Sequence, residues 1–122
     1  MSESRVEEHM PYTIEEIKTK AIPIAIRYGV EELSLFGSYA RGDADEKSDL
    51  DFLVRKGRMK GLLAYCGMIA DLEDTFRCHV DLVMKNAIKD EVFLKEVDRD
   101  EVKIYERERS GEDYIAKDDL VL

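Results

Sequence analysis

The strongest constraint on the fold is an aliphatic run that carries two aspartates. Residues 49–54 read Asp-Leu-Asp-Phe-Leu-Val and alternate polar with apolar side chains over their first four positions, as a half-buried strand does. This period of two places Asp49 and Asp51 on one face of the strand, with Cβ atoms about 7 Å apart. Leu50 and Phe52 then point to the other face. The pattern predicts a strand with a buried apolar face and an acidic face.

A second aliphatic run, Val80-Asp81-Leu82-Val83-Met84, predicts another strand with a carboxylate inside it. A single aspartate at a strand start is more often a cap or a solvent-exposed residue, but an unpaired charge in a buried strand is costly. If Asp81 met Asp49 and Asp51, the three carboxylates would repel one another and raise their own pKa values. A bound hard cation would remove that cost. Carboxylate oxygens suit Mg²⁺ or Mn²⁺, and neither histidine nor cysteine is placed to favour zinc.

The remaining patterns indicate an α/β (α+β) fold. Thr13 and Glu16 form a capping box that opens a helix over residues 13–28, in which Pro23 predicts a kink or a break into two short helices. Apolar spacing predicts further helices near residues 61–77 and 87–98 and short strands at residues 33–36 and 102–105. This order of elements predicts a mixed β-sheet of about four strands packed with helices.

Composition limits the classes of protein that the chain can be. Its 122 residues suit one domain, expected over residues 13–105, between a flexible N-terminal tail (1–12) and a polar C-terminal tail (106–122). A net charge of −9 disfavours direct nucleic-acid binding. The longest apolar runs are about five residues, against the roughly 18 of a membrane-spanning helix. With no secretory pattern at the start and no disulfide or zinc spacing of Cys66 and Cys78, we expect a cytoplasmic protein with no membrane partner.

A Gly-Ser pair, Gly37-Ser38, follows the strand expected at residues 33–36 and opens a helical turn. Backbone N–H groups and a hydroxyl at such a turn face an incoming anion. Alone, the pair would carry no information. It gains weight because it stands at a fixed distance before Asp49 and Asp51.

Residues 36–42 (Phe-Gly-Ser-Tyr-Ala-Arg-Gly) and 48–54 (Ser-Asp-Leu-Asp-Phe-Leu-Val) resemble the signature of the polymerase-β-type nucleotidyltransferases. That signature is Gly-Ser, ten residues, Asp, one residue, Asp, and residues 39–48 are the ten here. Asp81, within His-Val-Asp-Leu-Val, is similar to the third carboxylate that the family takes from a later strand. The resemblance spans residues 13–105 and is closest to the minimal nucleotidyltransferases (MNT), antitoxins of HEPN/MNT toxin–antitoxin pairs. It implies the nucleotidyltransferase fold.

The resemblance also implies a reaction and its metals. AMP would pass from ATP, the substrate, to a hydroxyl group, and pyrophosphate would leave. Asp49, Asp51 and Asp81 would be the catalytic residues and would bind two Mg²⁺ ions, with Mn²⁺ as an alternative. Asp81 could also accept the proton of the attacking hydroxyl.

Nucleotide binding would fall to the residues around the Gly-Ser motif. Gly37 and Ser38 would hold the terminal phosphates, and Arg41 would either pair with phosphate or brace the loop, both of which stay open. His79 shares a strand face with Asp81 by parity and could support the site, but a half-exposed histidine at a strand start is the favoured interpretation. The basic turn at residues 55–60 could contact triphosphate or an acidic partner, although a solvated turn is favoured.

The sequence alone does not identify the acceptor of AMP. Larger members of the family carry a second domain that binds the acceptor, for which this chain has no room. Minimal members act beside a HEPN-type toxin, and some transfer AMP to a toxin tyrosine. We therefore predict a protein adenylyltransferase that acts as antitoxin to a HEPN-type toxin. A non-catalytic antitoxin that neutralises by binding stays open, as does a stand-alone transferase for a small-molecule hydroxyl, for which a homo-oligomer could build a pocket. Base preference also stays open.

Overall fold

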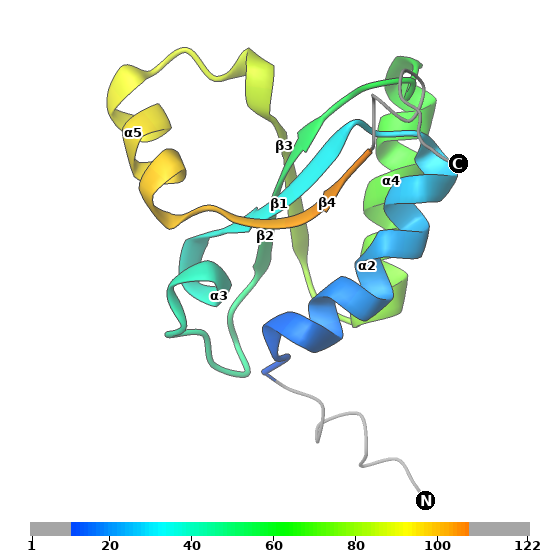
Figure 1. Cartoon of the computed structure of the whole chain (residues 1–122). Helices are drawn as coiled ribbons and strands as arrows, with labels where there is room; N and C mark the ends of the chain where they lie inside the picture. Colours follow the sequence, from blue (N-terminus) through cyan, green and yellow to red (C-terminus); the bar gives the residue numbers. More distant parts are fainter. Residues whose placement is uncertain (1–10, 108–122) are drawn as a thin grey trace, which may run out of the picture.

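Four strands form one mixed sheet in the computed structural model, which describes residues 11–107 (Figure 1). The elements follow in the order α2 (Ile14–Tyr28), β1 (Glu32–Phe36), α3 (Gly37–Arg41), β2 (Leu50–Arg55), α4 (Gly61–Phe76), β3 (Val80–Met84), the 3₁₀ helix η1 (Lys85–Ala87), α5 (Glu91–Asp100) and β4 (Val102–Glu106). The strand order is β3-β2-β1-β4; β1 is antiparallel to β2 and to β4, and β2 is parallel to β3. The predicted fold class is confirmed. Among residues 11–107, no helix combines the length and apolar character needed to cross a membrane.

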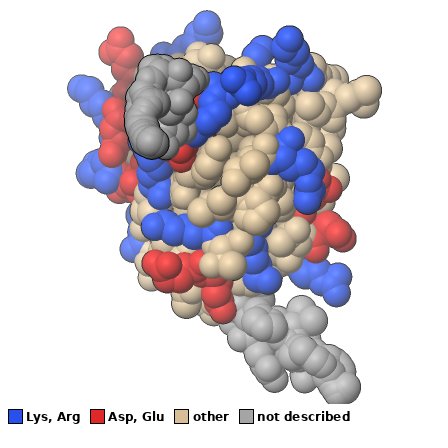
Figure 2. All heavy atoms as spheres, turned by 45° about the vertical axis from the view of Figure 1, so that its right-hand side comes forward, with Lys and Arg blue, Asp and Glu red and all other residues tan. Residues whose placement is uncertain are grey.

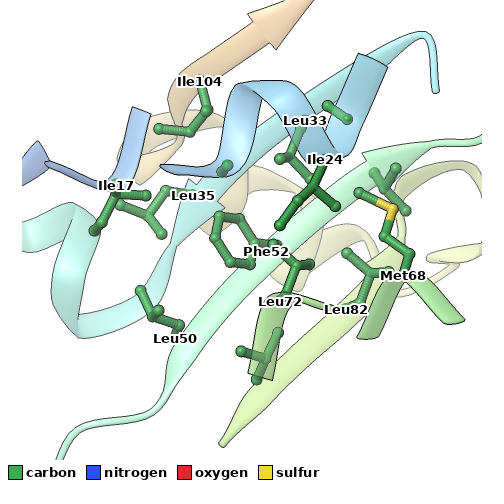
Figure 3. Close-up of a cluster of buried hydrophobic side chains, with 14 of the residues drawn as sticks. Ile17, Ile24, Leu33, Leu35, Leu50, Phe52, Met68, Leu72, Leu82 and Ile104 are labelled. Carbon is green, nitrogen blue, oxygen red and sulfur yellow. The ribbon is translucent and has the colours of Figure 1, made fainter. Parts of the chain in front are cut away.

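The main core lies between one face of the sheet and the helices α2 and α4, which run side by side over it (Figure 1). Leu50 and Phe52 of β2 point into this core and are fully buried, as the alternation predicts. Figure 3 shows them with partners from both helices and the other strands: Ile17, Ile24, Leu33, Leu35, Met68, Leu72, Leu82 and Ile104. Burial of each such side chain contributes roughly 1.5–3 kcal/mol. Because a one-residue slip would expose this set, the core fixes the register of β2 and the direction of its acidic face.

Helix α2 begins where the sequence predicts. The Thr13 hydroxyl accepts a hydrogen bond from the Glu16 amide (3.0 Å), and the Glu16 carboxylate accepts one from the Thr13 amide (2.9 Å). The break at Pro23 that we considered is wrong, because Pro23 lies inside one continuous helix. A proline removes one helical hydrogen bond. Ala21 and Ile24, on either side of Pro23, are buried in the core, and this packing keeps the helix continuous in spite of that loss.

Tyr12 belongs to the packed domain, although the sequence analysis places it in the N-terminal tail. Its side chain is buried, its ring meets Phe76 edge-on at 5.1 Å between centroids, and its hydroxyl donates to the Phe76 carbonyl oxygen at 2.7 Å. That bond satisfies a carbonyl at the C-terminal end of α4, where helical partners run out. The expected tail segments at residues 1–10 and 108–122 lie outside the described residues.

The connection from β3 to β4 joins the two edges of the sheet across the face opposite α2 and α4. Its helix, α5, starts at Glu91 rather than near residue 87, because the Asp90 side chain accepts from the amides of Val92 (2.9 Å) and Phe93 (3.3 Å) and caps the helix there. Phe93 then packs edge-on against Phe36 at the end of β1 (5.9 Å between centroids). Helix α5 therefore lies beside the start of the Gly-Ser turn.

Candidate functional site

Parallel pairing of β2 and β3 aligns the aspartates of the two strands. Asp51 lies directly opposite Asp81 in the register of Cα partners. One step earlier, the Leu50 amide donates to the His79 carbonyl oxygen at 3.1 Å, so the residues before the two strands are neighbours as well. Asp49 occupies this position on the β2 side. The structure thus brings the three predicted carboxylates to the amino-terminal ends of two adjacent strands.

His79 lies among these carboxylates. Its Nδ1 is 3.5 Å from an Asp49 oxygen and its Nε2 is 3.8 Å from an Asp81 oxygen. Asp49, His79 and Asp81 each offer one atom that could bind a metal ion, and these atoms lie within 4.8 Å of one another. The side chain is also half-exposed, at 58%, as predicted. Its parity with Asp81 was the signal in the sequence. We call Asp49, Asp51, His79 and Asp81 the acidic cluster.

Asp51 experiences the strongest electrostatic perturbation in the acidic cluster. Its pKa is raised to about 6, first by burial and then by the hydrogen bond and negative charge of Asp81, with a smaller contribution from Asp49. The nearby His79 opposes this rise. The like-charge repulsion that we expected from the sequence is therefore present at Asp51. A group with a pKa near 6 is partly protonated at neutral pH unless positive charge is supplied.

Gly37 explains why the Gly-Ser turn sits so close to these carboxylates. It has a φ of +75°, which side chains other than glycine rarely adopt, and a Cβ atom there would lie 2.4 Å from Oδ2 of Asp51. Ser38 follows as the second residue of α3, and its carbonyl oxygen accepts from the Gly42 amide. The missing side chain at Gly37 therefore lets the turn and the acidic cluster form a single site.

The acidic cluster borders an open groove of about 540 Å³ between β3 and α4. Beside Asp51, His79 and Asp81, the groove is lined by side chains of α4, among them Tyr65 and Glu73. Tyr65 donates a hydrogen bond to the Leu82 carbonyl oxygen, and a Glu73 oxygen accepts one from the Val80 amide at 3.2 Å; the two contacts tie α4 to β3. The α4 side of the groove thus carries Tyr65 and Glu73, and the strand side carries Asp51 and Asp81.

The donor set of the acidic cluster fits a divalent cation. Two carboxylates and one imidazole offer ligand atoms close to one another, and the carboxyl group of Asp51 is hydrogen-bonded to Asp81 beside them. Oxygen-rich sets of this kind suit Mg²⁺ or Mn²⁺. The metal ligands predicted from the sequence include Asp49 and Asp81 of this group and Asp51 beside it, and their role stays a prediction.

A family comparison agrees with this geometry. The model of the nucleotidyltransferase domain matches residues 14–118. The chain belongs to the nucleotidyltransferase family. A protein of Methanocaldococcus jannaschii named "Putative protein adenylyltransferase MJ0435" is 42% identical over 89 residues, which are 70% of this chain and 96% of that protein. The enzyme class predicted from the sequence, a nucleotidyltransferase, is confirmed.

Two solved structures share the fold of this nucleotidyltransferase. One is a toxin–antitoxin crystal structure with AMP-PNP (TM-score 0.63, 22% identity, covering 78% of this chain and 77% of that chain). The other is tri-AMPylated Shewanella oneidensis HEPN toxin in complex with MNT antitoxin (TM-score 0.60, 19% identity, covering 82% of this chain and 78% of that chain). At these identities, the likeness shows the fold.

Arg41 of the nucleotidyltransferase is not among the residues that line the groove. Its Nε is 3.4 Å from an Asp43 carboxylate oxygen, and it lines a cavity of about 130 Å³ between α3 and α5 together with Glu96 and Asp100. Asp43 is thus the acidic partner of the guanidinium, and two further acidic residues line the same cavity. Gly37 lines the same cavity, so both interpretations of Arg41, a phosphate contact and a brace of the loop, stay predictions.

The basic turn at residues 55–60 is remote from the acidic cluster. In the β1–β2 register, Arg55 pairs with Glu32 at one end of the strands and Asp51 with Phe36 at the other, so the turn begins four residues of extended strand from Asp51. Arg55 also donates to Glu32 at 3.0 Å. Figure 2 brings the side with α2 and α4 forward and shows Lys and Arg spread over it among uncharged and acidic residues. This placement argues against a triphosphate contact by the turn.

Proposed function

We propose that this nucleotidyltransferase moves AMP from ATP to a hydroxyl of a partner protein, a tyrosine of a cognate HEPN-type toxin, and thereby acts as its antitoxin. The observation that carries the proposal is the acidic cluster beside Gly37, which has the carboxylates that this transfer needs. Support also comes from a relative named as a protein adenylyltransferase and from the fold shared with an antitoxin in complex with an AMPylated HEPN toxin.

The carboxylates would act on the attacking hydroxyl oxygen and on the bridging oxygen that leaves with pyrophosphate. Asp49, Asp51 and Asp81 would hold two Mg²⁺ ions, or Mn²⁺, which supply positive charge to the triphosphate and to the attacking oxygen. Asp81 is more exposed than Asp51 and faces the groove, where it would accept the proton of the acceptor hydroxyl. A bond forms between that oxygen and the α-phosphorus, the bond to the bridging oxygen breaks, and pyrophosphate leaves.

The Gly-Ser turn would position the leaving group. Backbone N–H groups at Gly37 and Ser38 would donate to the terminal phosphates, close to Asp51 because Gly37 has no side chain. Holding the nucleotide in line with an incoming hydroxyl is the main catalytic contribution that a protein makes to phosphoryl transfer.

The open groove supports a macromolecular acceptor. About 540 Å³ of open space borders Asp51 and Asp81, and within residues 11–107 no second domain covers it. A tyrosine side chain presented by another protein could enter this space. The remaining walls would then come from the partner.

Intact-protein mass spectrometry tests the proposal. The chain is incubated with Mg²⁺ and ATP, with and without the product of the neighbouring gene. We expect an AMP-sized mass gain on that partner, located on tyrosine by fragmentation. In the variant Asp49→Asn/Asp51→Asn, the rate of AMP transfer should fall at least about 10³-fold, so that no mass gain is detected. A matched control is Asp74→Asn/Asp98→Asn, which removes two exposed helical carboxylates that are not members of the cluster.

The outcomes separate three functions. Neutralisation of the partner by Asp49→Asn/Asp51→Asn as strong as by the wild type would contradict catalysis and favour an antitoxin that acts by binding. A stable complex with no mass gain points the same way. If there is no mass gain and no stable complex, the search should turn to small-molecule hydroxyl acceptors.

A further inference from the structure

His79 is placed by the fold but is not used by the mechanism above. Its backbone carbonyl accepts from the Leu50 amide at 3.1 Å, which pins the residue to the start of β2. Its side chain is 58% exposed, so the core does not need it. The imidazole nevertheless points both ring nitrogens at carboxylates, one on each of two strands. An exposed side chain held between two negative groups suggests a role in what those groups bind.

The distances distinguish a hydrogen-bonded histidine from a ligand. The nitrogen–oxygen separations of 3.5 Å to Asp49 and 3.8 Å to Asp81 exceed the 2.7–3.2 Å range of a good hydrogen bond. Ligands held about 2.1 Å from one octahedral cation are about 3 Å apart when adjacent and about 4 Å apart when opposite. The three ligand atoms lie within 4.8 Å of one another, so adjacent ligands would contract by up to about 2 Å to reach this spacing.

We propose that His79 supplies a nitrogen ligand to a divalent cation held with Asp49 and Asp81, and that this ligand makes the site prefer Mn²⁺ to Mg²⁺. The inference deepens the proposed function, on which it rests for the role of the cation. It assigns to this chain a ligand outside the three carboxylates.

The preference follows from ligand chemistry. Mg²⁺ strongly favours oxygen ligands and keeps much of its water, whereas first-row transition ions accept imidazole readily. A nitrogen ligand therefore raises the affinity for a transition ion more than for Mg²⁺. The same nitrogen also raises the affinity for zinc, which exceeds that for Mn²⁺ at a given site, so the proposed preference is that of Mn²⁺ over Mg²⁺.

Direct metal binding tests the assignment without any catalytic readout. Mn²⁺ is titrated into the full chain and followed by electron paramagnetic resonance, and Mg²⁺ is measured by competition. Pulsed resonance on the Mn²⁺-loaded protein then reports whether a nitrogen nucleus is bound to the metal. We expect a nitrogen coupling in the wild type and tighter binding of Mn²⁺ than of Mg²⁺.

Two variants separate the ligand from its neighbours. His79→Gln should lose the nitrogen coupling and about tenfold in Mn²⁺ affinity, with Mg²⁺ affinity within about twofold. Asp81→Asn, the comparison variant, should weaken both ions and keep the coupling in the Mn²⁺ that still binds. Thermal melting checks that His79→Gln is folded, which its exposure leads us to expect.

The results also keep the two proposals apart. A wild-type site without nitrogen coupling, or an equal loss of Mn²⁺ and Mg²⁺ affinity in His79→Gln, overturns the assignment of His79. If AMP transfer with Mg²⁺ persists in that case, the proposed function stands. A nitrogen coupling lost in His79→Gln, together with no AMP transfer to any partner, would support the ligand and contradict the proposed function.

Discussion

Charged side chains gather in two regions of the molecule, which differ in whether neighbouring charges are alike or opposite. The acidic cluster gathers three carboxylates at the start of β2 and β3. The second region, which we call the ion-pair network, matches acids with bases: Glu32 with Arg55 (3.0 Å) and Lys103 (3.2 Å), and Glu101 with Lys85 (2.8 and 3.0 Å). Like charges therefore meet in one region, and opposite charges meet in the other.

The pKa values of two carboxyl groups record this difference. Burial alone would raise the pKa of Glu101, but hydrogen bonds, first of all from Lys85, outweigh it and the pKa is lowered. Burial also raises the pKa of Asp51, and there the neighbouring Asp81 adds to the rise, up to about 6. A similar degree of burial thus has opposite results, because the neighbour is a base at Glu101 and an acid at Asp51. The ion-pair network therefore stabilises the fold. The repulsion within the acidic cluster lowers stability, and we interpret this loss as the cost of forming a site.

Substitution of Gly37 should have the largest effect on the acidic cluster. In Gly37→Ala, the new Cβ would lie 2.4 Å from Oδ2 of Asp51, so that carboxylate must move by about 1 Å. A misplacement of this size lowers the rate of a positioned reaction about 100-fold. The rate of AMP transfer, measured by mass spectrometry under single-turnover conditions, is the readout.

Gly42→Ala is the matched control. Gly42 also has a positive φ, +86°, but an added Cβ would meet nothing within 4 Å. Both variants should lose about 1 kcal/mol of stability from the backbone conformation alone, and Gly42→Ala should retain its activity. Equal losses of activity in the two variants would show that the contact with Asp51 does not matter.

The sequence predicted the acidic cluster better than the ion-pair network, for a physical reason. Alternation assigned Asp49, Asp51 and Asp81 to strand faces, and it did so from local pattern alone. The order of the strands did not follow from this alternation, because alternation shows which face of a strand a side chain lies on but not which strand lies next to it. The pair of Lys85 with Glu101 depends on the path of α5 across the sheet, and the burial of Tyr12 depends on the distant end of α4. Contacts of this kind leave no periodic signal.

Removal of Lys85 should have the next largest effect, and it should fall on stability rather than activity. In Lys85→Met, the carboxylate of Glu101 stays largely buried, 12% exposed, without its main partner. We expect a loss of about 2 kcal/mol in the free energy of unfolding at pH 7, measured by urea denaturation. Because the pKa of Glu101 is lowered in the folded state, the pair stabilises above the ordinary value of 4.5, and that contribution is lost as the pH falls.

Lys103→Met provides the comparison within the ion-pair network. Lys103 is about half-exposed, and Glu32 keeps Arg55 when it is lost. Its removal should therefore cost no more than about 0.5 kcal/mol. If Lys85→Met and Lys103→Met were equally mild, burial of the Lys85–Glu101 pair would not be the source of its strength.

A smaller effect than that of Lys85→Met, and one of opposite sign, is expected in Asp51→Asn, which should gain stability. The folded state holds a proton on Asp51 more tightly than the unfolded state does between the ordinary pKa of 3.8 and about 6. Wild-type stability should thus fall as the pH rises through this range, and the variant should lack that fall. At pH 7 we expect Asp51→Asn to be more stable by about 1 kcal/mol, because solvent screening leaves only part of the roughly 3 kcal/mol that the full shift represents.

Thermal melting at pH 4 and pH 7, without divalent cation, checks this sign. The two proteins should melt close together at pH 4, where Asp51 of the wild type is mostly protonated in the folded state, and should separate at pH 7. Addition of Mn²⁺ at pH 7 should raise the melting temperature of the wild type more than that of Asp51→Asn, because the ion binds the folded state and supplies the missing positive charge. A variant less stable than the wild type at pH 7 would mean that Asp51 stabilises the fold, as Glu101 does, and the contrast between the two regions would not hold.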